Sequence, residues 1–127
     1  MKILLILYIL ALTMLSGSAK SQQINCGDFK IGSFKLEITN YNLPSTIVYR
    51  NEKIQKESSD GADDLEGTIE WKSDCSYELR YLNGPPEMID KAIFVEIISF
   101  EGQKAICTST FEDLPGVVLE FKMEKLE

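Results

Sequence analysis

The 127-residue sequence contains no histidine, three cysteines and one tryptophan. Without histidine, the chain cannot form a Ser-His-Asp triad or supply a histidine general base or metal ligand. It also has no C-x-x-C pair, which excludes the common dithiol redox and zinc motifs. Thirteen basic residues against twenty acidic ones give a formal charge of −7, and such a surface repels nucleic-acid phosphates. We therefore predict no catalytic residues, no metal, no cofactor and no nucleic-acid partner.

The first nineteen residues have the three regions of a secretory signal peptide. Lys2 is followed by the apolar run 3–15, which is too short to span a bilayer, and by the small residues Gly17 and Ala19. We expect a signal peptide over 1–19 and a single exported domain over 20–127, whose charge without Lys2 is −8. Leu-Ser-Gly at 15–17 begins like a lipobox, but Ser18 stands where a lipid-anchored protein needs cysteine. We therefore predict a periplasmic or extracellular protein that is soluble after cleavage and has no integral membrane span.

The rest of the chain alternates apolar and polar residues at period two, which is typical of half-buried strands. Turn-forming residues interrupt this alternation every eight to twelve residues, and no long helix is indicated. We expect strands over 32–39, 46–50, 53–57, 65–72, 75–81, 92–100, 104–111 and 117–123, with 53–57 as a polar edge strand and 92–100 covered on both faces. The predicted fold is all-β: a single antiparallel meander of seven or eight strands, forming an up-and-down, lipocalin-like barrel or a strongly curled sheet. The expected core consists of Phe34, Leu36, Ile69, Trp71, Tyr77, Leu79, Val95, Ile97, Leu119 and Phe121.

Three short segments carry a resemblance to other proteins: C-x-x-F-K-x-G-x-F at 26–34, Y-R-N-E at 49–52 and I-x-W-x-x-D-C-x-Y at 69–77. The chain resembles a group of small exported β-proteins and lipoproteins from Bacteroidetes-type bacteria. The group has no established activity. Its members often carry the label DNA topoisomerase IV, which this short, acidic, exported chain contradicts. Gly-Ser-Phe at 32–34 is also similar to the G-x-W start of lipocalin barrels, although three residues imply nothing about function.

The odd number of cysteines leaves one without a partner in an exported protein. Cys26 and Cys75 belong to the resembling motifs and sit beside strand starts, whereas Cys107 lies inside a strand, where it fits a packed core thiol. We predict a disulfide between Cys26 and Cys75. Two reduced, buried thiols are the alternative.

Tyr49, Arg50 and Asn51 form the one surface feature that we interpret as a recognition site, with Trp71 as a further candidate. A guanidinium at a strand end can make forked hydrogen bonds to a partner's carboxylate. A structural role in the turn is the competing interpretation. If Trp71 were exposed, it would be a binding residue rather than a core residue.

Three other groups of residues have both a functional and a structural interpretation: a pair of carboxylates, an acidic loop and a set of aromatic residues. Glu70 and Glu78 could act as paired carboxylates of a hydrolase or carbohydrate-active domain, but their parity places them outward, in a cross-strand charge ladder with Lys72 and Arg80. The acidic loop 60–64 could hold calcium, or it is a solvated hairpin tip. Aromatic residues could line a ligand cavity or fill a core; these are Phe34, Trp71, Tyr77, Tyr81, Phe94 and Phe121. We therefore expect a non-enzymatic cell-envelope domain that binds a protein partner or a small apolar ligand, with a hydrolase as the alternative.

Overall fold

A computed structural model describes residues 24–126. A single-turn 3-10 helix, η1 (Cys26–Phe29), precedes eight strands. The strands are β1 (Gly32–Ile38), β2 (Thr46–Arg50), β3 (Ile54–Ser59), β4 (Leu65–Ser73), β5 (Ser76–Tyr81), β6 (Ile93–Glu101), β7 (Lys104–Phe111) and β8 (Leu114–Lys125). The predicted signal peptide lies outside the described residues.

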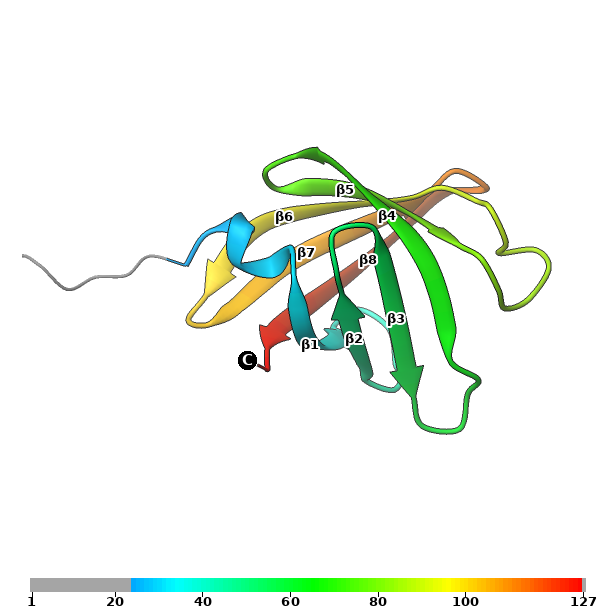
Figure 1. Cartoon of the computed structure of the whole chain (residues 1–127), viewed down its shortest axis with the longest axis horizontal. Coiled ribbons are helices and arrows are strands. Elements are labelled where there is room, and N and C mark those ends of the chain that lie inside the picture. The colour runs from blue at the N-terminus through cyan, green and yellow to red at the C-terminus, as the bar shows by residue number, and fades with distance from the viewer. Residues whose placement is uncertain (1–23, 127) are drawn as a thin grey trace, which may run out of the picture.

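The eight strands form one closed antiparallel barrel in which each strand pairs with the next along the chain (Figure 1). Closure is made by β1 and β8, whose register places Phe34 opposite Lys125 and Ile38 opposite Phe121. A closed barrel leaves no strand edge unpaired. The predicted all-β meander is confirmed, as an up-and-down barrel rather than an open curled sheet.

The inward-facing side chains of the strands form the core of the barrel. Seven of the ten predicted core residues are buried, while Leu36, Trp71 and Leu119 are half-buried. The sequence prediction missed Phe29 and Met123, which are almost fully buried. Phe29 belongs to η1, an element that the period-two pattern cannot reveal.

The prediction that β6 is covered on both faces is wrong. Phe94 and Ile98 are 44% and 58% exposed, because each strand of a barrel has only one inward face. A bulge between Ile97 and Ser99 then changes the parity of the strand. After the bulge, Phe100 pairs with the buried Ala105 and its ring lies 5.9 Å from that of Phe29.

The prediction of β3 as an edge strand is also wrong, because β3 pairs with β2 and with β4. β3 is polar because two of its polar side chains face the interior of the barrel. Gln55 is 3% exposed and Glu57 is half-buried, and the two side chains lie on the inward face of the strand.

One end of the barrel is closed by η1, which Figure 1 shows lying beside the turn between β6 and β7. Cys26 of η1 and Cys75, in the turn between β4 and β5, lie at disulfide distance with their sulfur atoms 2.02 Å apart. The predicted pairing is confirmed, and Cys107 is the buried cysteine left over. Within 24–126, no helix is long and apolar enough to cross a membrane.

Candidate ligand-binding site

The barrel contains a cavity of about 190 Å³ that opens to solvent at the end opposite η1, where the loops 39–45, 60–64, 82–92 and 112–113 join the strands. Its lining is mostly apolar, with four polar side chains and the hydroxyl groups of two tyrosines. The lining residues are Leu36, Ile38, Thr46, Gln55, Glu57, Tyr77, Leu79, Tyr81, Met88, Ile93, Val95, Ser109, Phe111, Leu119 and Phe121. An apolar cavity of about 150 Å³ is large enough to bind benzene. The space therefore suits one ring or a short alkyl chain.

A fully buried arginine lies between this cavity and the closed end of the barrel. The guanidinium of Arg50 donates from Nε to Gln55 Oε1 over 2.7 Å, from Nη1 to the carbonyl oxygen of Phe29 over 2.8 Å, and from Nη2 to the hydroxyl oxygen of Tyr77. Its Cζ atom also lies 4.4 Å from the ring centroid of Tyr77 and 5.5 Å from that of Phe34. Each guanidinium nitrogen thus has an acceptor, which a buried charge requires.

The polar network continues from Arg50 toward the cavity through the side-chain amide of Gln55. Gln55 Nε2 donates to Glu57 Oε2 over 2.8 Å, and the hydroxyl of Tyr81 donates to the same oxygen over 2.6 Å. The amide therefore joins a guanidinium on one side to a carboxylate on the other, without direct contact between the two charges.

Gly67 makes the contact between Tyr81 and Glu57 possible. On the sheet, Gly67 of β4 lies between Gln55 of β3 and Tyr81 of β5. A Cβ atom at this glycine would lie 2.8 Å from the carbonyl oxygen of Arg80. With no side chain on the inward face of β4 here, the Tyr81 ring can extend across that strand to Glu57.

Burial keeps both tyrosine hydroxyls in their neutral form. Loss of hydration raises the pKa of Tyr77 to about 12, and it raises the pKa of Tyr81 further, with an additional contribution from the nearby carboxylate of Glu57. A neutral Tyr81 hydroxyl is the form that can donate to Glu57.

The predicted recognition site on Tyr49, Arg50 and Asn51 does not exist as one surface. The side chain of Tyr49 is 54% exposed, whereas that of Arg50 is fully buried, because successive residues of a strand point to opposite faces. Asn51 is exposed, but its Oδ1 accepts hydrogen bonds from the backbone N–H groups of Lys53 and Ile54. Arg50 is therefore an interior residue, and Asn51 stabilises the turn between β2 and β3.

Trp71 lies toward the closed end of the barrel and does not line the cavity. Its ring packs 4.8 Å from that of Tyr77, and Lys30 Nζ lies 5.1 Å from its centroid. The indole is half-buried, and its Nε1–H is buried without a hydrogen-bond partner. Of the six aromatic residues considered as a cavity lining, Tyr77, Tyr81 and Phe121 do line it.

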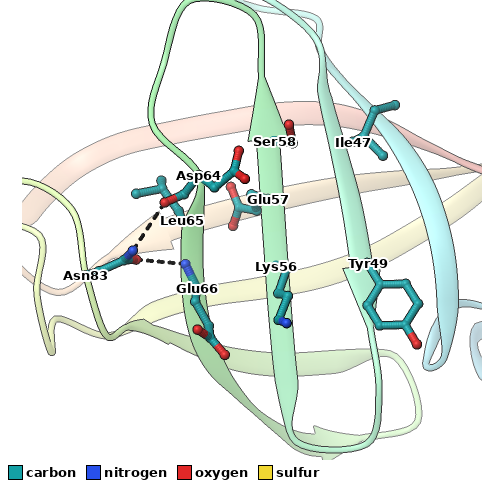
Figure 2. Close-up of a pocket in the computed structure, with 9 residues that line it drawn as sticks. All are labelled: Ile47, Tyr49, Lys56, Glu57, Ser58, Asp64, Leu65, Glu66 and Asn83. Carbon is teal, nitrogen blue, oxygen red and sulfur yellow. Dashed lines mark hydrogen bonds between the residues drawn. The ribbon is translucent and has the colours of Figure 1, made fainter.

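A second hollow, of about 350 Å³, lies on the outer surface of β2, β3 and β4 (Figure 2). Tyr49, Lys56 and Glu66 lie side by side on the three strands. Asn83 borders the hollow, where it accepts a hydrogen bond from the backbone N–H of Glu66 and donates one to the carbonyl oxygen of Asp64. Tyr49 is thus part of a surface hollow, although not of the predicted one.

The carboxylate pair considered for hydrolysis lies on the outer surface of the barrel. Glu70 and Glu78 are directly opposite each other on β4 and β5. Their ion pairs run along each strand, from Lys72 to Glu70 over 3.1 Å and from Arg80 to Glu78 over 3.5 Å, rather than across the strands as predicted. Within residues 24–126, the acidic loop 60–64 belongs to no group of three metal-binding side chains.

No known family, curated protein or solved structure matches the chain.

Cys107 makes the stability of the barrel sensitive to alkali. Burial raises the pKa of its thiol from 9.0 to about 12, and the pKa of Tyr77 rises from 10.0 to about 12. Above pH 9 the unfolded chain therefore loses protons that the folded chain retains, and stability falls as the pH rises toward 12. Urea unfolding between pH 8 and 11 at constant ionic strength should show this decline, with a later onset in Cys107→Ala. Constant stability over this range would contradict it.

Proposed function

We propose that the protein is a non-enzymatic, exported β-domain that binds a small, mostly apolar ligand inside its barrel. The observation that carries this proposal is the cavity of about 190 Å³, whose largely apolar lining includes a few converging polar groups. Sites for small molecules have this composition, and the mouths of β-barrels commonly hold them.

Export is supported by the predicted signal peptide and by the disulfide between Cys26 and Cys75, since such bonds persist in oxidising compartments. Membership of the group of small exported proteins that the sequence resembles is also part of the proposal. It is supported by the contact between the first and third of the resembling motifs, which the disulfide joins. The non-enzymatic assignment is supported by the outward position of Glu70 and Glu78, neither of which lines the cavity.

Titration with phenol, a neutral ligand with one aromatic ring, tests the site. We expect saturable chemical-shift changes in the amide spectrum at cavity residues such as Leu36, Val95 and Phe121. Ser109→Leu should abolish these changes because the new side chain fills the cavity from β7. Thr110→Leu, on the exposed face of the same strand, is the matched control.

Two results would overturn the proposal. One is an absence of saturable shifts at the cavity residues. The other is a set of shifts confined to the outer hollow around Tyr49, which would identify that surface as the binding site instead.

A further inference from the structure

The charge of the cavity lining gives the proposed site a preference for one class of ligand. Of the residues that line the cavity, Glu57 alone has an ionisable carboxylate, and none has a basic side chain. A bound ligand would therefore meet one acidic group among side chains that are apolar or uncharged. In such surroundings, the interaction between two charges is stronger than in water.

The two carboxylate oxygens of Glu57 have different roles. Oε2 accepts from Gln55 Nε2 over 2.8 Å and from the Tyr81 hydroxyl over 2.6 Å, which holds the group in one orientation. Oε1 accepts no hydrogen bond from any residue between 24 and 126, and it is not among the buried polar atoms left without a partner. A carboxylate oxygen can accept two hydrogen bonds. Glu57 borders both the inner cavity and the outer hollow, and Oε1 is the acceptor that the protein leaves available to a ligand.

The buried cation of the network does not supply this missing donor. Arg50 directs its three nitrogens to Gln55, to the Phe29 carbonyl and to Tyr77, and its side chain does not line the cavity. The amide of Gln55 lies between the guanidinium and the carboxylate. A ligand in the cavity thus approaches the acidic end of the network.

We propose that the cavity selects a small primary amine bearing a single ring or a short alkyl chain, whose ammonium group donates to Glu57 Oε1. The apolar part then lies against side chains such as Leu36, Val95 and Phe121. The aromatic rings of Tyr77 and Tyr81 in the lining also favour a cation. This inference rests on the proposed ligand-binding function and adds the chemical class of the ligand.

A ligand of the same shape with an acidic head group is excluded by the same geometry. Its carboxylate would face Glu57 in a space that lacks a basic side chain. An alcohol can donate to Oε1 but brings no charge. The expected order of affinity is therefore amine, then alcohol, with the acid below detection.

Calorimetric titration of the full chain at pH 7 with 2-phenylethylamine, 2-phenylethanol and phenylacetate tests this order. These probes share one ring and differ in the head group. Because a hydrogen bond to a charged group contributes about 1.5–3 kcal/mol, we expect the amine to bind about 10- to 100-fold more tightly than the alcohol. This comparison needs no variant, so it holds even if substitutions in the network prevent folding.

Glu57→Gln keeps the shape of the side chain and removes its charge. We expect it to lose the preference of the parent protein for the amine while its affinity for the alcohol changes less than about threefold. Glu70→Gln removes a carboxylate from the outer surface, where the side chain is 69% exposed, and should leave all three affinities unchanged. A thermal melt of each variant confirms that it is folded.

The outcomes separate this inference from the proposed function. If the alcohol or the acid binds as tightly as the amine, or if Glu57→Gln retains the preference, the amine selectivity is wrong although the cavity still binds ligands. If neither these probes nor phenol bind in the cavity, the proposed function fails and the amine selectivity fails with it.

Discussion

Replacing Arg50 by alanine should lower the free energy of unfolding by about 3–5 kcal/mol, the range for breaking a buried charged network. The substitution removes the donor to the Phe29 carbonyl, to Gln55 Oε1 and to the Tyr77 hydroxyl, all in the barrel interior. It also removes the cation that is linked to the Glu57 carboxylate through Gln55. Chemical denaturation followed by Trp71 fluorescence measures the loss.

Arg80 offers a matched control, because it is the other arginine of the chain. Its side chain is 37% exposed and pairs with Glu78 and Asp90 over 3.5 and 3.7 Å. Asp90 is 85% exposed and Glu78 is 14% exposed, and ion pairs at the surface contribute about 0–1 kcal/mol, so Arg80→Ala should have a smaller effect than Arg50→Ala. Equal losses in the two variants would show that the buried hydrogen bonds of Arg50 contribute no more to stability than the surface ion pairs of Arg80.

Removing the disulfide should have an effect of similar size. Cys26 and Cys75 are 49 residues apart, and closing a loop of that length contributes about 4 kcal/mol in the loop-entropy description. The double variant Cys26→Ala/Cys75→Ala should therefore unfold at much lower denaturant concentration. Loss of the bond also frees η1, whose Phe29 closes one end of the barrel.

Reducing agent supplies the control for this prediction. The parent protein should lose stability when dithiothreitol is added, whereas the double variant, which has only Cys107 left, should not respond. Peptide mapping without reductant gives an independent check. Recovery of the Cys26 and Cys75 peptides unlinked would contradict the assignment.

The fold could be predicted because strand periodicity is a local property. Leu65, Ile69 and Trp71 lie on one face of their segment and Glu66 and Glu70 on the other, which is sufficient to identify a half-buried strand. The bulge after Ile97 could not be predicted from this pattern, since the apolar residues there occupy both parities. The sequence therefore indicated two covered faces where the barrel has one.

Three of the aromatic residues considered as a cavity lining do line the cavity, but the polar network beside it could not be predicted, because its members come from distant parts of the chain. Arg50 is joined to Phe29, 21 residues earlier, and to Tyr77, 27 residues later. The alternation in 46–50 puts Arg50 on the same face as the apolar Val48. The opposite face carries Ile47 and Tyr49, which are apolar too, so the local pattern does not show which face is inward. One indication of the network was present in the sequence: Gln55 and Glu57 are two residues apart in the polar strand 54–59, so their side chains lie on the same face.

Closure of the barrel by β1 and β8 has a consequence for folding. These strands come from opposite ends of the domain, so the last contact of the sheet spans the whole chain, and such long-range pairing is slow. Before β8 pairs with them, β1 and β7 each have an unpaired edge to which a strand of another chain can bind. The disulfide joins two residues that precede β6, so it can form before β8 pairs. It then holds η1, and the β1 strand that follows η1, beside the β4–β5 turn while the edge of β1 is still unpaired.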